Sequence, residues 1–200
     1  ADGAHYVTEK SILDIEAYKR ATSVYLVDRV IPMLPEKLSN DLCSLNPNTK
    51  KLTLTCEMTI WNNWAIKSQK VYESIIESNH RLTYKEVDDI LNWDLRKSEK
   101  LEKTLKIANQ LKQKITKYRK STWVLDFEFP ETKIILDEDN KPVSIKEYPR
   151  YESNKMIEEF MISANQAVSM EFSKLPFLYR IHEEPKIEDL AKLQETLNLF

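Results

Sequence analysis

The residues of this chain that could do chemistry on their own are few and scattered. Its two cysteines, Cys43 and Cys56, share no short metal-ligand spacing, which favours free buried thiols in a reducing compartment over a zinc site or a disulfide. Asp2 and Asp41 are isolated, and neither is interpreted as a metal ligand. The sequence has no glycine-rich phosphate loop, His/Cys cluster or nucleophile elbow. Spacing alone therefore predicts no catalytic residue and no metal site in this chain.

Charge and hydropathy narrow the possible classes of function. The 200-residue chain carries 30 Lys+Arg and 32 Asp+Glu, a net charge of -2, and its pI is about 6.0. Proteins that coat nucleic acid through phosphate contacts are usually basic, so we expect at most a narrow local channel for one strand. The mean hydropathy of -0.53, the absence of a membrane-length apolar run and the lack of a signal-peptide pattern at Ala1–Tyr6 predict a soluble, cytoplasmic domain.

Hydrophobic periodicity predicts the helices that must position any functional side chain. Ser11 is expected to cap the first of them, with Ile12 and Ile15 on its apolar side. Thr83 and Glu86 have the spacing of a capping box. The predicted helices are Ser11–Arg20, Pro35–Asn40, Thr83–Leu91, Lys97–Lys120, Tyr151–Phe172 and Ile187–Leu197.

Two hairpins are predicted from alternating apolar residues and turn-rich connections. Leu52–Ile60 alternates with its apolar residues on one face, which is typical of a half-buried strand, and it is expected to pair with Ala65–Ser74. Glu131–Leu136 and Pro142–Tyr148 flank a turn-rich segment. Further strands are expected at Ala1–Val7 and Phe177–His182. The sequence therefore predicts an α+β fold, with a mixed or antiparallel sheet and hairpins packed against several helices.

Longer stretches of the sequence carry a resemblance to a known family. The strongest runs from Arg20 to Leu45 and contains Tyr25-Leu26-Val27-Asp28-Arg29. Val124–Phe127, Ile157–Asn165 and Pro176–Glu183 follow in the family's order, and Ala1–Val7 matches a strand near its beginning. Together these stretches resemble, along nearly the whole chain, the RNB catalytic module of RNase II/RNase R-type 3′→5′ exoribonucleases.

The resemblance implies a mechanism and a set of RNA-binding residues. In these enzymes single-stranded RNA enters a channel 3′ end first, and Mg²⁺ held by clustered aspartates activates the water that releases nucleoside 5′-monophosphates. Aromatic stacking grips any base, because every base has a π-face. By matching motif, Tyr25 and Phe127 resemble the two halves of the aromatic clamp, and Glu158 resembles the carboxylate that contacts a ribose hydroxyl. Tyr84 matches a further aromatic residue of the RNA path.

Each of these residues has an alternative interpretation that needs no RNA. Without the resemblance, Tyr25 and Phe127 would be core aromatics, Glu158 an exposed helix residue and Tyr84 an ordinary first-turn residue. The lysines of Lys100–Lys120 would form a solvated helix face.

The resemblance also implies that this chain is an internal part of the catalytic module, residues 1–200. The family's aspartate cluster is expected upstream and its arginine motif downstream, so the chain alone is expected to be inactive and its parent to be a monomeric, Mg²⁺-dependent enzyme. Two alternatives remain open: a noncatalytic RNA-binding relative that kept the channel, and an α+β interaction module without an RNA function.

Glycine is abnormally rare in this sequence. The chain has one glycine, Gly3, where ordinary usage is about 7%. Trp64, Trp93 and Trp123 lie in turn-like contexts, at positions where members of the family usually carry glycine. We hypothesise that the source organism reads UGA as glycine and that these three codons were translated as tryptophan.

Overall fold

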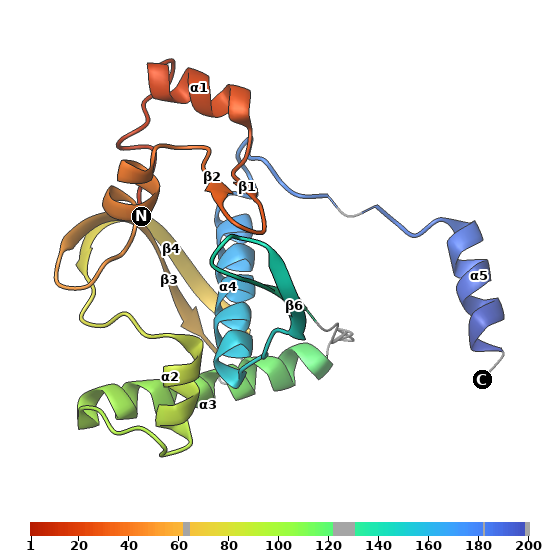
Figure 1. The fold of residues 1–200 in the computed structure, drawn as a ribbon. Coiled ribbons are helices and arrows are strands. Elements are labelled where there is room, and N and C mark those ends of the chain that lie inside the picture. Colours follow the sequence, from red (N-terminus) through yellow and green to blue (C-terminus); the bar gives the residue numbers. More distant parts are fainter. Residues whose placement is uncertain (62–64, 122–130, 182, 199–200) are drawn as a thin grey trace.

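The computed structural model of the chain describes residues 1–61, 65–121, 131–181 and 183–198. Helices and short antiparallel hairpins alternate along it (Figure 1), which confirms the α+β prediction. The elements are α1 (Ile12–Arg20), β1 (Val24–Tyr25), β2 (Val30–Ile31), the π-helical segment η1 (Lys37–Leu42), β3 (Lys50–Ile60), β4 (Ile66–Glu77), α2 (Tyr84–Leu91), α3 (Glu99–Ser121), β5 (Thr132–Leu136), β6 (Pro142–Glu147), α4 (Glu152–Glu171) and α5 (Ile187–Leu197).

Each strand pairs with its neighbour in the sequence. The β3–β4 hairpin is the longest, with Leu52 opposite Ile75, and the β5–β6 hairpin pairs Ile134 with Ile145. The β1–β2 hairpin is much shorter. Within the described residues the sheets are therefore three separate antiparallel pairs, one of the two arrangements that the sequence left open.

α1 and α2 begin at the caps that the sequence predicts. The Ser11 hydroxyl accepts a hydrogen bond from the Asp14 backbone, and Thr83 and Glu86 form the predicted capping box, so both helix starts are confirmed. α4 packs against α2, α3 and the β3–β4 hairpin, and Figure 1 shows it running across the middle of the fold. The buried apolar side chains of this region are Val87, Ile90, Ile115, Met156 and Ala167.

The buried face of β3 differs from the predicted one at the start of the strand. Leu54 is 58% exposed, whereas Lys51 and Thr53 of the opposite face are buried. Their polar groups are satisfied there: the Lys51 ammonium donates to the Asp41 carbonyl at 2.7 Å, and the Thr53 hydroxyl lies 2.7 Å from that of Ser74. These partners, which lie far away in the sequence, override the apolar alternation.

Two strand predictions are wrong. Gly3–Tyr6 forms a turn in which the Tyr6 amide donates a hydrogen bond to the Gly3 carbonyl. Ala1–Val7 is therefore not a strand, although the Asp2 amide donates a hydrogen bond to the Leu52 carbonyl of β3. Phe177–His182 forms no strand over its described residues. The Phe177 ring instead stacks on Phe172 at 5.2 Å, and the Tyr179 hydroxyl donates to the Phe172 carbonyl. Local side-chain contacts therefore take the place of strand pairing.

The two ends of the chain expose more apolar surface than the periodicity suggests. Ile12 of α1 is 87% exposed, and α5 stands away from the rest of the fold in Figure 1 with Leu190 and Leu193 exposed. The cysteines are free, as predicted, but Cys43 and Cys56 are half-buried rather than buried. Within the described residues, no helix is both long enough and apolar enough to span a membrane.

Asparagine and other residues take the backbone conformation that glycine usually supplies. Asn48 and Asn140 have positive φ, which asparagine tolerates better than most residues. Trp93 has a φ of 69°, in the left-handed region that a bulky side chain rarely occupies. Trp93 is therefore conformationally abnormal, while Trp64 and Trp123 lie outside the described residues.

Candidate nucleic-acid interface

The junction between α2 and α4 is fixed by a cap supplied from another helix. The Asp88 carboxylate of α2 accepts hydrogen bonds from the backbone amides of Glu152 and Ser153 at 3.0 and 2.9 Å. The first amides of a helix have no partner within it, so Asp88 satisfies two of the unpaired donors of α4. The buried Ser153 hydroxyl donates to the Tyr84 carbonyl at 2.8 Å. The backbone of Tyr84 is thereby anchored at the start of α4.

Tyr84 combines this fixed backbone with an exposed ring. It is the first residue of α2, directly after the Thr83 cap, and 40% of its surface is exposed. The Thr83 amide donates to Glu86, which holds the pKa of that carboxyl below its usual value. Tyr84 is thus an exposed aromatic side chain on a rigid support, as a stacking residue requires.

Glu158 lies one and a half turns into α4, exposed, and its carboxylate is held by Arg150. The guanidinium of Arg150 donates to Glu158 Oε2 at 2.9 Å, and the two side chains are 36% and 50% exposed. Arg150 precedes α4, next to the Tyr151 cap. The junction that anchors Tyr84 is therefore also the segment from which Arg150 reaches Glu158.

Glu159, the next residue, is buried and has a structural environment. Its carboxylate accepts hydrogen bonds from the Thr116 hydroxyl at 3.0 Å and the Arg119 guanidinium at 2.8 Å, both on α3. Lys112 of α3 donates to Glu152 at 2.6 Å, which holds the pKa of Glu152 below its usual value. This polar network joins α3 to α4, whereas Glu158 points to the exposed side and pairs with Arg150.

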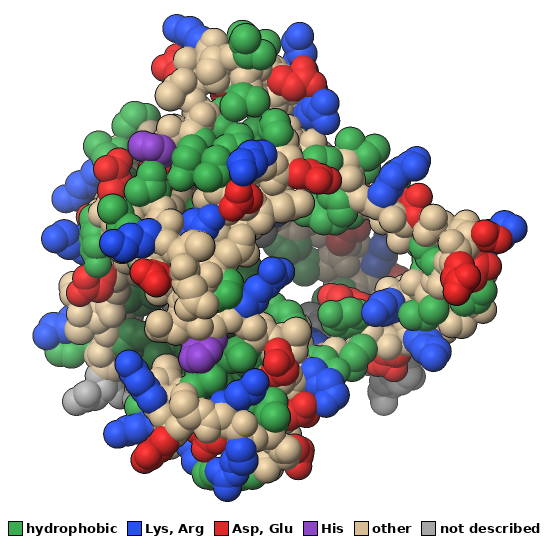
Figure 2. All heavy atoms as spheres, turned by 60° about the vertical axis from the view of Figure 1, so that its left-hand side comes forward, with side chains coloured by type: hydrophobic (Ala, Val, Ile, Leu, Met, Phe, Trp, Pro, Cys, Tyr) green, Lys and Arg blue, Asp and Glu red, His purple; other side chains and the backbone are tan. Residues whose placement is uncertain are grey.

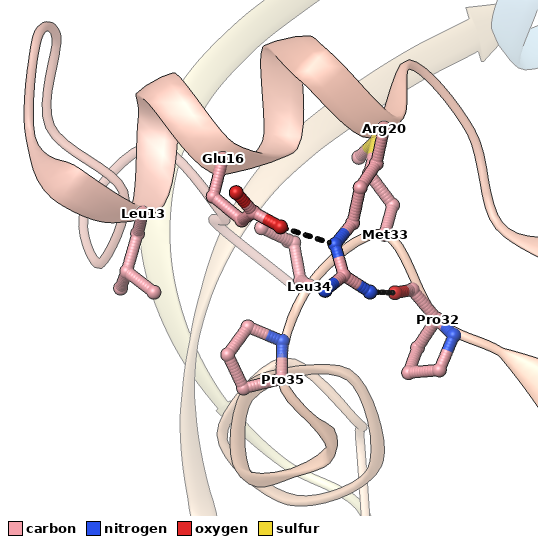
Figure 3. Close-up of a pocket in the computed structure, with 7 residues that line it drawn as sticks. All are labelled: Leu13, Glu16, Arg20, Pro32, Met33, Leu34 and Pro35. Carbon is pink, nitrogen blue, oxygen red and sulfur yellow. Dashed lines mark hydrogen bonds and ion pairs between the residues drawn. The ribbon is translucent and has the colours of Figure 1, made fainter.

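Tyr25 lies on the separate β1–β2 hairpin, whose base is closed by side chains. The Ser23 hydroxyl accepts from the Met33 amide at 2.9 Å. The Arg20 guanidinium donates to the Pro32 carbonyl at 3.1 Å and pairs with Glu16 at 2.8 Å, beside a small cavity of about 110 Å³ (Figure 3). Tyr25 itself is 78% exposed. The interpretation of Tyr25 as a core aromatic is therefore wrong.

The structure relates only some of the predicted site residues. Tyr84 is anchored at the start of α4, Glu158 lies further along the same helix, and Tyr25 is held on another element. Phe127, the other predicted half of the clamp, lies outside the described residues. Sequence reasoning missed Asp88, Ser153 and Arg150. Asp88 and Ser153 are far apart in the sequence, so no local signal indicates their contact. Arg150 carries a local signal, because it directly precedes a helix and an acidic residue follows eight positions later.

Charge on the surface is mixed. Figure 2 shows basic and acidic side chains interspersed over the face that it displays, without a continuous basic patch there.

Within the described residues, no group of three or more His, Cys, Asp or Glu side chains is placed to hold a metal ion. Asp41 is paired with Lys37 and Lys51, and Asp2 accepts the His5 amide. The described residues therefore do not fit a resident metal.

Comparison with known proteins places this geometry in a family. The family model described as the RNB domain matches residues 1–199 of the sequence. The chain is 44% identical to ribonuclease R 2 of Lactococcus lactis subsp. lactis, with 98% of the chain and 31% of that protein covered. It is also 44% identical to ribonuclease R of Mycoplasmopsis pulmonis, over 98% of the chain and 27% of that protein.

Solved structures give the same result. The RNase R of Mycoplasma genitalium, determined in complex with ribose-methylated single-stranded RNA, superimposes with a TM-score of 0.94 at 37% identity, over 99% of this chain and 32% of that one. The chain thus spans about a third or less of the relatives that it matches.

Proposed function

The chain belongs to the RNB domain family, and from that membership we propose that it is part of the catalytic region of a 3′→5′ exoribonuclease that degrades single-stranded RNA to nucleoside 5′-monophosphates. The observation that carries the proposal is the match over nearly the whole chain, in sequence and in fold, to ribonuclease R. The exposure of Tyr25, Tyr84 and Glu158 is compatible with the proposal, because a side chain that contacts RNA must be accessible to it.

We propose that this part of the enzyme grips the RNA. Tyr25 and Phe127 would stack on bases near the 3′ end, with Tyr84 as a further aromatic contact. The Glu158 carboxylate would accept a hydrogen bond from a ribose 2′-hydroxyl, which DNA lacks. Each of these contacts is independent of base identity, so the enzyme would degrade RNA of any sequence.

We propose that residues of the parent enzyme outside this chain hold the metal. Mg²⁺ is proposed as the cofactor of the parent enzyme, where it would activate the attacking water. Among the described residues no group of side chains is placed to hold such an ion, so the contribution proposed for them is RNA binding. The parent is further proposed to be monomeric and cytoplasmic, and residues 1–200 by themselves to be inactive.

A direct experiment uses the full-length protein and a 5′-labelled single-stranded RNA. We expect stepwise shortening from the 3′ end and release of nucleoside 5′-monophosphates, identified by chromatography. RNA with a blocked 3′ end is the control and should survive. Internal cleavage, or release from the 5′ end, would contradict the proposal.

The same experiment separates the alternatives. A noncatalytic RNA-binding relative would retard the labelled RNA in a gel without shortening it. An interaction module without an RNA function would do neither. Both alternatives remain in the test, although the match to ribonuclease R favours the enzyme.

A further inference from the structure

Arg150 binds one oxygen of the Glu158 carboxylate. Arg150 donates to Glu158 Oε2 at 2.9 Å across a separation of eight residues. A glutamate on an exposed helix face otherwise samples several rotamers, and fixing one costs conformational entropy. The ion pair therefore restricts Glu158 to the orientations that keep Oε2 on the guanidinium.

Arg150 directly precedes the hydrogen-bonded start of α4. The neighbouring Tyr151 caps α4, and its amide donates to the Asn154 side chain at 3.0 Å. The next two amides are capped by Asp88 of α2, whose first residue is Tyr84. The guanidinium thus projects from a residue whose C-terminal neighbours are held by hydrogen bonds.

We propose that Arg150 is a positioning residue that orients the Glu158 carboxylate toward the ribose of bound RNA and so sets the discrimination between ribose and deoxyribose. The proposal rests on the proposed function, in which Glu158 accepts a ribose hydroxyl. An ionised carboxylate offers about four lone-pair sites on two oxygens, so Oε2 can stay on Arg150 while Oε1 accepts the hydroxyl.

Arginine suits this role better than lysine. Its planar guanidinium presents donors in a rigid fork, whereas the lysine ammonium is a point charge on a flexible stem. A half-exposed ion pair contributes little to stability, so its value here lies in orientation rather than in holding the fold. A variant of Arg150 should therefore keep the fold and change selectivity.

The test measures binding of the full-length protein to single-stranded oligonucleotides with divalent metal removed by a chelator, so that no hydrolysis interferes. A single 2′-deoxy nucleotide is moved one position at a time through the 3′-terminal region. The readout is the ratio of affinities for the all-ribose and the singly substituted strands. In the unmodified protein one or two positions should show a preference for ribose of about tenfold, as expected for a hydrogen bond to a charged group.

Three variants carry the argument. Arg150→Gln should reduce the preference to less than about threefold at those positions alone, and Arg150→Lys should give an intermediate value. Arg96→Gln is the control: it removes the same charge from another arginine–glutamate pair, in which Arg96 is exposed and Glu102, near the start of α3, is largely buried. It should lower affinity for every strand equally, if at all, and leave the ratio unchanged.

Glu158→Ala distinguishes failure of the inference from failure of the proposed function, because it removes both acceptor oxygens, whereas glutamine would keep one. If Glu158→Ala abolishes the ribose preference and both folded Arg150 variants retain it, Arg150 is not a positioning residue. If Glu158→Ala retains the preference, the ribose contact itself is refuted. Should Arg150→Gln fail to fold, the lysine variant alone decides, and an unchanged ratio overturns the inference.

Discussion

Glu158 and Glu159 are adjacent in the sequence, yet arginines on different elements bind their carboxylates. Arg150, just before α4, holds the half-exposed Glu158, and Arg119 of α3 holds the buried Glu159. Neighbouring residues on a helix point about 100° apart, so one faces solvent while the other faces the α3 packing surface. Adjacent carboxylates thereby have different environments: that of Glu159 joins α3 to α4, and that of Glu158 is the one for which we propose a contact with RNA.

The two glutamates should respond differently to the same substitution. Glu159→Gln leaves the largely buried Arg119 without its carboxylate and should lower local stability by about 2 kcal/mol. Glu158→Gln disturbs only a half-exposed pair and should cost less than about 1 kcal/mol. Amide hydrogen exchange across α3 and α4 in the full-length protein measures the change in local stability caused by each substitution. Equal effects would show that Glu159 is not part of the packing surface.

The packing of α3 on α4 should weaken in acid. The hydrogen bond and charge of Lys112 hold the pKa of Glu152 below its ordinary value of 4.5, against the smaller opposing effect of burial. A carboxyl with a lowered folded-state pKa contributes stability that is complete above the unfolded-state pKa and is lost as pH falls through the folded-state pKa. Protection of α3 and α4 amides should therefore decline as the pH falls below 4.5.

Glu152→Gln isolates this contribution from that of the other carboxyls. The variant should be less protected than the native protein near neutral pH, and the difference should vanish in acid. Because the Glu152 side chain is 61% exposed, solvent screens the pair and the difference should stay under about 1 kcal/mol. A difference that persists at the lowest pH would indicate packing rather than charge.

Tyr25→Ala tests the aromatic clamp. Since Tyr25 is 78% exposed, its truncation should change stability by no more than about 0.5 kcal/mol. Loss of one base stack should weaken RNA binding by about 1–3 kcal/mol and alter the length of the end product on a sequencing gel. Phe127→Ala should have the same effect on RNA binding and on the length of the end product.

Tyr18→Ala is the matched control, because Tyr18 is a tyrosine of α1 with 87% of its surface exposed. It should leave both affinity and end-product length unchanged. If the Tyr25 and Phe127 variants also leave both unchanged, the clamp assignment is wrong and an interaction module becomes the better interpretation.

Local patterns predicted the elements well, because local chemistry determines them. The Thr83–Glu86 capping box lies within four residues, and the apolar spacing of Lys97–Lys120 extends over the whole of α3. The supports of the site depend instead on distant pairs. Asp88 caps α4 from 64 and 65 residues away, and Lys51 is buried because η1 supplies an oxygen ten residues earlier. Neither contact leaves a periodic signal in the sequence.

The roles of the predicted site residues could not come from the pattern either. An exposed tyrosine such as Tyr25 has the same sequence signature as a buried one, so composition favoured the core. Motif similarity reversed that assignment. The structure then added what motif similarity lacked, namely that Glu158 is held by Arg150 and that Tyr84 is anchored by Ser153.

Trp93 occupies a backbone position that favours glycine. It follows the Asn92 cap of α2, and the Trp93 and Asp94 amides donate to the Ile90 and Asp89 carbonyls at 3.3 and 2.8 Å. These are the two bonds of a Schellman motif, whose left-handed residue is usually glycine. With φ at 69°, Trp93 bears the steric conflict of a Cβ in that conformation. This agrees with the hypothesis that position 93 is encoded as glycine.

Trp93→Gly and Trp93→Ala, compared with each other, test this position. Both lose the contacts of the indole with Arg96 and Lys106, so only the Cβ distinguishes them. Glycine should be more stable than alanine by about 1 kcal/mol, measured by hydrogen exchange in α2. At Ala108 in the middle of α3, by contrast, replacing alanine by glycine should lower stability, because glycine weakens a helix interior. The gene supplies the independent test: UGA codons at 64, 93 and 123 support recoding, and UGG codons there refute it.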